Sequence, residues 1–278
     1  MRRRKSYNKY PYLILLIIHS SLLIFTFYKN KNRKQLFVAL ISNIGMAYIF
    51  EYFTYNLFKA YRYKPAMLKN KNLDSILGAV FSQAIFIPFT ALFITSFHLG
   101  WKFKLFASIY FASIEHLFVR LGIYTQYWWK TTYTLVLLPI YFWITSKWDE
   151  HLKKRTPAIL FVSSFNLIMV TSVNILFLES FMGKLRFGFH RHTWYEHFIL
   201  MPLYSIIVGF FTARTKDVKN SLFVNVKFLG YRLLLDWLLV KAKILKFNQK
   251  NVLNNLPYHV LMIMLSNYYK NIVYKKTE

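Results

Sequence analysis

Two acidic residues that interrupt long apolar stretches are the first candidates for chemistry in this chain. Glu115 lies near the centre of the stretch from Lys104 to Tyr124, and Glu51 lies one turn from the middle of the stretch from Leu36 to Phe58. If these stretches cross a bilayer, each charge costs at least about 2.5 kcal/mol at the centre. Each carboxyl group is therefore expected to meet a partner or to line a water-filled cavity.

Helix geometry decides which neighbours Glu115 can use. Arg120 lies five residues later, about 140° around a helix, so Glu115 must find its partner on another helix. His116 and Arg120 do share a helix face. The intramembrane polar set is Glu51, Glu115, His116 and Arg120. It allows three hypotheses: hydrogen-bonded links between helices, a proton-linked cation site, or an acid/base pair with Glu115 and His116 as catalytic candidates.

A second group of candidate residues is the segment HRHTWYEHF, which holds His190, His192, Glu196 and His197. These side chains could hold a zinc ion at headgroup level. A simpler interpretation places Glu196 in the first turn of a helix, where the helix dipole favours a negative charge. The H-x-x-H-H boxes of membrane di-iron enzymes do not occur, and we predict neither a metal nor a cofactor.

Aromatic residues mark the expected membrane boundaries. Trp128, Trp129 and Lys130 follow the stretch that contains Glu115. Amphipathic rings concentrate at the headgroup level of a bilayer, which favours an interfacial position for these three residues. A stacking wall for a lipid or another ligand is the alternative.

The elements that would position these residues are transmembrane helices. Apolar residues make up 56% of the chain and charged residues 17%, which is below the value for soluble domains. A bilayer core needs about 20 apolar residues in a helix. Seven stretches of about this character are Pro11 to Tyr28, Leu36 to Phe58, Ser75 to Leu99, Lys104 to Tyr124, Thr131 to Ser146, Ala158 to Leu178 and Tyr195 to Ala213.

The tail is expected to differ from the bundle. Between residues 221 and 250, Arg232, Asp236 and several lysines fall on one arc, apart from Leu234 and Trp237. A basic stripe beside Leu and Trp is typical of a helix lying in the headgroup layer. We predict an all-α polytopic bundle of about seven spans (seven to nine) with a basic amphipathic C-terminal helix. The alternative is that 222–240, 253–269 or both also span. Residues 1–278 form one membrane domain, with the bundle in 1–213 and the tail in 214–278, and no segment is predicted to be a strand.

Charge and missing motifs narrow the partners. The net charge of +27 comes from short basic clusters between apolar runs, which favours anionic lipid headgroups over nucleic acid. The chain has no Cys, no GxxxxGK[ST], no GxGxxG, no GxSxG and no HExxH, which excludes thiol chemistry and the common nucleotide and hydrolase sites. The basic cluster at residues 2–5 favours a cytoplasmic N-terminus.

The stretch EYFTYNLFKAYRYKP and the later SIEHLFVRLGIYTQYWWKTTYT resemble segments of uncharacterised multi-pass membrane proteins of Bacillus-type spore-forming bacteria. The resemblance covers roughly residues 51 to 148. It implies a bacterial cytoplasmic membrane and carries no assigned activity.

Three function classes follow. The first is a membrane structural or assembly factor that interacts with lipids or with another membrane protein. The second is a small permease that uses Glu51 and Glu115, and the third is a lipid-modifying enzyme. The first class is favoured, because it needs no buried reactive group.

Overall fold

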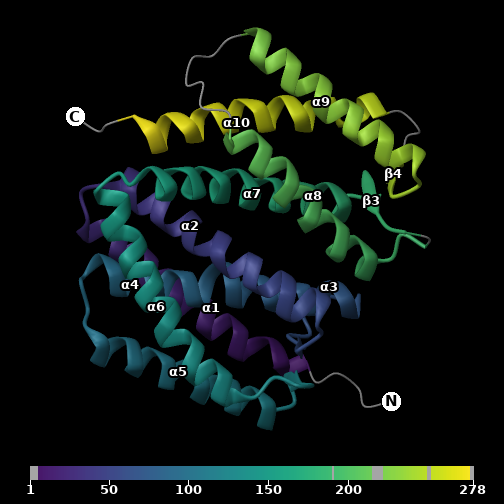
Figure 1. Ribbon diagram of the computed structural model, residues 1–278. Coiled ribbons are helices and arrows are strands. Elements are labelled where there is room, and N and C mark those ends of the chain that lie inside the picture. Colours follow the sequence, from purple (N-terminus) through teal and green to yellow (C-terminus); the bar gives the residue numbers. More distant parts are fainter. Residues whose placement is uncertain (1–5, 190, 215–221, 249–251, 276–278) are drawn as a thin grey trace. The chain divides into compact units, whose positions relative to one another are not determined.

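The chain forms two compact units in the computed structural model, Met1–Thr156 and Pro157–Glu278, called unit 1 and unit 2 below. The structure describes residues 6–189, 191–214, 222–248 and 252–275 (Figure 1). Whether both units belong to one membrane domain, with a separate tail after residue 213, stays a prediction.

Unit 1 consists of helices and two short strands (Figure 1). Its elements are η1 (Ser6–Asn8), α1 (Lys9–Lys29), α2 (Arg33–Glu51), η2 (Tyr52–Leu57), β1 (Tyr61–Tyr63), α3 (Lys71–Val80), η3 (Phe81–Phe86), α4 (Ile87–Ser96), α5 (Trp101–Arg120), β2 (Tyr124–Gln126) and α6 (Thr131–Lys153). The segments η2 and η3 are π-helical, and they extend α2 and join α3 to α4. Asn70 begins α3 by accepting hydrogen bonds from the backbone N–H groups of Asn72 and Leu73.

Unit 2 repeats this pattern with fewer elements (Figure 1). They are α7 (Pro157–Phe181), β3 (Leu185–Phe187), α8 (Trp194–Arg214), α9 (Leu222–Lys241), β4 (Leu245–Phe247), η4 (Val252–Asn255) and α10 (Leu256–Tyr274).

Five helices are long and apolar enough to cross a membrane in the part of the chain that the structure describes: Lys9–Lys29, Arg33–Leu57, Lys71–Ser96, Pro157–Phe181 and Trp194–Arg214. The predicted all-α class is therefore supported, whereas the predicted count of seven spans is not confirmed. Helix α5 contains four charged residues (Lys102, Lys104, Glu115 and Arg120), which makes it less apolar than the five.

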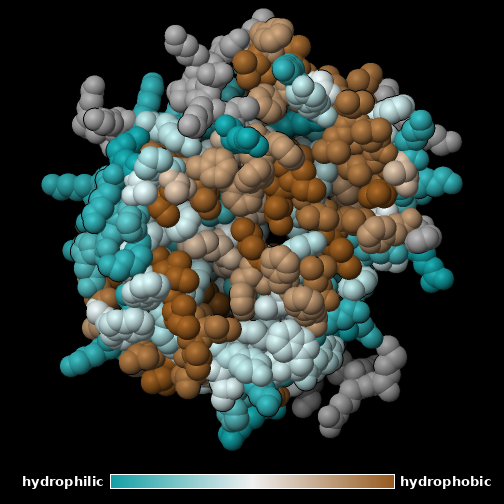
Figure 2. Space-filling model, in the orientation of Figure 1, coloured by the Kyte–Doolittle hydropathy of each residue, from teal (hydrophilic) through white to brown (hydrophobic). Residues whose placement is uncertain are grey.

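Apolar side chains face outward, as they do in proteins surrounded by hydrocarbon. Ile17, Phe106 and Phe223 are 66%, 68% and 76% exposed. Figure 2 shows apolar residues over much of the visible surface. A soluble monomer rarely exposes large continuous apolar patches. The surface therefore supports a membrane environment for the helices.

The prediction that the chain contains no strand was wrong. Strand β1 pairs with β2 and strand β3 with β4, both antiparallel, with Arg62 opposite Thr125 and Arg186 opposite Lys246. Each strand has three residues, which is too short for an alternating apolar pattern to be recognised in the sequence. The strands join loops that lie far apart in the chain.

Each strand follows a helix end of the same design. Four residues with positive φ, namely Lys59, Gly122, Gly183 and Lys243, stand two positions before β1, β2, β3 and β4 respectively. At three of these ends the next N–H bonds a carbonyl five residues back, as from Ile123 to Phe118 and from Ile244 to Leu239. This is the hydrogen bond of a Schellman motif, which ends a helix with a left-handed residue. At each of these ends the turn leads the polypeptide from the helix into the following strand.

The two units are consequently built on one plan. Here α2 with η2 counts as one helix, and α3, η3 and α4 together count as one helix. From α2 to α6 and again from α7 to α10, the order is then helix, strand, helix, helix, strand, helix, with the two strands paired. Short sequence likenesses do not reveal this plan, because it consists of turn geometry and strand pairing.

The predicted orientation of the tail helix was wrong at its centre. Arg232 and Asp236 in α9 are 3% and 0% exposed, whereas Trp237 and Leu238 are each 48% exposed. The polar arc at these positions thus faces the interior of unit 2 and the apolar side faces outward. A headgroup-layer helix would present the opposite faces.

The left-handed turn before β3 yields a stability prediction with an internal control. Gly183 has φ +75°, and a Cβ there would meet open space, so Gly183→Ala adds only backbone strain. We expect the substitution to lower the free energy of unfolding of the detergent-solubilised protein by about 1 kcal/mol. Gly230 lies within α9, where a Cβ would also meet open space, so Gly230→Ala should raise the free energy of unfolding by roughly 0.5–1 kcal/mol. Denaturant titration measures the free energy of unfolding of both variants. A change of the same sign in both would contradict the left-handed turn at Gly183.

Candidate functional site

Unit 1 contains a cavity of about 320 Å³. It is lined by the paired strands β1 and β2, by Trp129, and by side chains of α2, η3, α4, α5 and α6. The lining residues are Met46, Ala47, Phe50, Tyr61, Tyr63, Ser82, Gln83, Ile87, Glu115, Tyr124, Trp129, Thr134, Leu137, Leu138, Ile140, Tyr141 and Ile144. A smaller cavity of about 70 Å³ shares Glu115, Thr134 and Leu138 with it. The volume is within the range of small-molecule sites.

Glu115 is the acidic group in the cavity lining, and neutral donors hold it. Gln126 Nε2 and Thr131 Oγ1 donate to Glu115 Oε1 over 2.6 and 2.9 Å. Thr134 Oγ1 donates to Glu115 Oε2 over 2.5 Å. The partners of Glu115 thus come from β2 and α6. This agrees with the expectation that Glu115 finds its partner on another element, because Arg120 lies on a different face of its own helix.

Glu51 lies behind the cavity wall. Tyr61 Oη donates to Glu51 Oε2 over 2.5 Å, and Gln83 Nε2 donates to the same oxygen over 3.0 Å. Both donors line the cavity, and Glu51 is 7% exposed. Glu51 immediately precedes the π-helical η2, and Gln83 lies within the π-helical η3. Such segments are frequent at functional sites.

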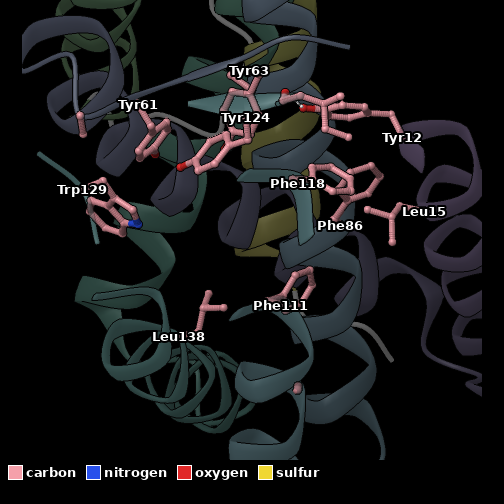
Figure 3. Packing of buried hydrophobic residues seen from close by; sticks show 14 of the residues in the cluster. Tyr12, Leu15, Tyr61, Tyr63, Phe86, Phe111, Phe118, Tyr124, Trp129 and Leu138 are labelled. Carbon is pink, nitrogen blue, oxygen red and sulfur yellow. Dashed lines mark hydrogen bonds between the residues drawn. The ribbon is translucent and has the colours of Figure 1, made fainter. Parts of the chain in front are cut away.

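Four of the cavity-lining residues, Tyr61, Tyr63, Tyr124 and Trp129, are aromatic residues of the buried core cluster (Figure 3). The ring centroids of Tyr61 and Tyr124 are 5.4 Å apart, those of Tyr63 and Tyr124 are 5.0 Å apart, and Trp129 meets Tyr61 edge-on at 5.4 Å. Burial raises the pKa of Tyr61 in β1 well above its ordinary value, and the charge of Glu51 acts in the same direction. The Tyr61 hydroxyl therefore keeps its proton and acts as a donor.

The predicted headgroup residues divide between surface and interior. Trp128 is 46% exposed, whereas Trp129 is 8% exposed and its indole N–H donates to Thr134 over 3.0 Å. Trp129 is therefore a cavity residue and is not part of an exposed aromatic belt. Lys130 precedes α6 and is exposed.

His116 and Arg120 are both exposed. The catalytic pairing of Glu115 with His116 is not assembled in unit 1, because the Glu115 carboxylate binds Gln126, Thr131 and Thr134 while His116 lies at the surface.

The histidine segment of unit 2 has a structural arrangement. Thr193 and Glu196 exchange hydrogen bonds between side chain and backbone at the start of α8, over 3.3 and 3.4 Å. This is a capping box, as the T-x-x-E spacing would have predicted. His197 is 0% exposed and its Nδ1 accepts the backbone N–H of Phe187. Among the residues that the structure describes, its buried Nε2 has no hydrogen-bond partner, and the same holds for His192 Nε2.

His190 lies outside the described residues. Among the residues that the structure places, no three His, Cys, Asp or Glu side chains are arranged to hold a metal ion.

Sequence reasoning missed a buried network in unit 2. Asp236 accepts hydrogen bonds from Tyr204 Oη over 2.9 Å and from Asn255 Nδ2 over 2.5 Å. His259 Nε2 lies 2.9 Å from Asp236 Oδ2, and both side chains are fully buried. These four residues lie on α8, α9, η4 and α10 with no local motif, so the only available signal was the presence of Asp in an apolar helix.

The networks of the two units occupy equivalent positions. Glu115 and Asp236 each stand nine residues before the start of a strand, β2 and β4. Thr134 bonds Glu115 and Asn255 bonds Asp236, and each pair is separated by 19 residues. Leu138 and His259 each follow their acidic residue by 23 positions. The position 23 residues after the acidic residue is thus Leu138 in unit 1 and His259 in unit 2.

The cavity of unit 1 combines apolar walls with a single acidic group among its described lining residues. An apolar cavity meets a carboxylate held by neutral donors, and Glu115 and His116 do not form an acid/base pair there. Comparisons with protein-family models, with curated proteins and with solved structures find no match to this chain.

Proposed function

We propose that this chain is a multi-pass integral protein of a bacterial cytoplasmic membrane that binds a membrane amphiphile in the cavity of unit 1. The proposal belongs to the lipid-interacting class expected from the sequence. We propose that anionic lipid headgroups bind the basic loops and that the cavity binds one specific molecule. The N-terminus is cytoplasmic in this proposal.

The observation that carries the proposal is the distribution of polarity in the cavity. Phe50, Leu137, Ile140 and Ile144 line it together with other apolar and aromatic side chains, whereas Glu115 supplies its acidic group. An apolar pocket with a few convergent polar groups fixes the orientation of a ligand that has an apolar body and a polar end. Amphiphiles of the bilayer have this construction.

The position of the cavity residues in α6 supports access from the membrane. Ile140 and Ile144 line the cavity and are 44% and 38% exposed. Both residues are apolar and lie in a helix that the proposal places in the bilayer, so their exposed surface would meet hydrocarbon. An alkyl chain could enter between such residues without crossing a polar surface.

The permease and enzyme hypotheses lack a comparable observation. The carboxyl groups of Glu51 and Glu115 are each held by neutral donors within unit 1. The proposed binding function needs only that these groups keep their positions.

A pair of tryptophan variants in α6 tests the cavity. Ile140→Trp places bulk at the cavity, whereas Leu135→Trp makes the same kind of change at a residue of similar exposure (44% and 42%) outside the lining. We expect Ile140→Trp to lower the amount of co-purified amphiphile at least several-fold, and Leu135→Trp to leave it unchanged. Native mass spectrometry of the detergent-solubilised proteins measures both. Equal occupancy in the two folded variants would overturn the assignment of the cavity.

Membrane integration is tested separately by extraction. The outward apolar side chains predict that the chain stays in the membrane pellet after washing with alkaline carbonate or urea and is released by detergent. The chain has no Cys, so single introduced cysteines can be labelled from each side without background. Release of the chain by carbonate alone would contradict the membrane assignment.

A further inference from the structure

Unit 2 shows how this framework satisfies its carboxylate from within the chain. Asp236 is fully buried, and beside its neutral donors Tyr204 and Asn255 it has the His259 imidazole at 2.9 Å. An imidazole can place an N–H, and when protonated a positive charge, against the carboxylate. Burial of an acidic group is tolerated when such a partner is present.

Unit 1 has no basic side chain at the equivalent position. The residue there is Leu138, which cannot donate a hydrogen bond, and it lines both cavities together with Glu115. A ligand group in the larger cavity can therefore approach the Glu115 carboxylate beside Leu138.

The residues that line the cavity favour a positive charge on the polar group of the ligand. The chain contains 37 Lys and Arg, yet no Lys, Arg or His occurs among the described residues that line the cavity. An anionic head would face Glu115 without a compensating charge. A cationic head would face a carboxylate and the rings of Tyr61, Tyr124 and Trp129, whose π faces attract cations.

From this comparison we propose that the polar end of the amphiphile is an ammonium group, bound at Glu115 beside Leu138, the residue equivalent to His259 of unit 2. The inference rests on the proposed function, because it names the ligand class of the same cavity. The ammonium would give Glu115 a cationic partner in addition to its three neutral donors.

The experiment compares two probes of equal chain length, decylamine and decanol, by calorimetric titration of the protein in a maltoside detergent. We expect wild-type protein to bind the amine at least ~10-fold more tightly than the alcohol, which a favourable contact of about 1.4 kcal/mol would produce. Glu115→Gln should abolish this preference by weakening the amine alone. Glu150→Gln removes an exposed carboxylate from the same unit and should leave the preference intact.

A second variant tests the comparison between the units. Leu138→His supplies the imidazole that unit 2 uses at the equivalent position, so it should weaken amine binding at least ~10-fold while the thermal unfolding temperature stays at or above the wild-type value. If this variant does not fold, the Glu115→Gln titration still decides the question.

The outcomes separate the two proposals. Equal binding of amine and alcohol to wild-type protein, with both lost in Ile140→Trp, would overturn the ammonium inference and leave the amphiphile site standing. Binding of neither probe, together with no co-purified amphiphile, would overturn both. A preference for the amine that persists in Glu115→Gln would also overturn the inference, because micelle charge rather than the carboxylate would then explain it.

Discussion

A carboxylate removed from water must be given partners, and this requirement organises the polar interior of both units. Glu115 and Asp236 lie nine residues before a paired strand, where the following helix brings a donor back to them. In each unit the strand lies between the acidic residue and this donor, and it pairs with a strand that is distant in the sequence. Unit 2 has His259 beside its carboxylate, whereas unit 1 has Leu138 at the equivalent position, in the lining of the cavity. The proposed ligand follows from this difference.

The surroundings of the helices explain why the polar groups lie inside. Apolar residues such as Phe106 and Phe223 are exposed, while Arg232 and Asp236 are buried. This arrangement suits hydrocarbon, in which an exposed ionisable group costs more than an exposed ring. The same reasoning accounts for the tail helix, whose polar arc faces the interior of unit 2 at its centre.

The sequence predicted the helical class, the long apolar helices and hydrogen-bond partners for Glu51 and Glu115, because long apolar runs and isolated charges within them are local signals. It did not predict the strands, since three residues carry no period, or the pairing of Asp236 with His259, since 23 residues separate them. Gly122 and Gly183 could have marked two of the left-handed turns, but Lys59 and Lys243 occupy the other two without any compositional sign. The cavity depends on how side chains from several helices pack, and no pattern along the chain encodes it.

A crystal structure of the full chain grown from a lipidic mesophase would show what occupies the cavity of unit 1. We expect elongated density in the cavity, with one end within hydrogen-bonding distance of Glu115 and in contact with Leu138. A cavity closed by the chain's own side chains, or a Glu115 carboxylate paired with a Lys, Arg or His of the protein, would contradict it.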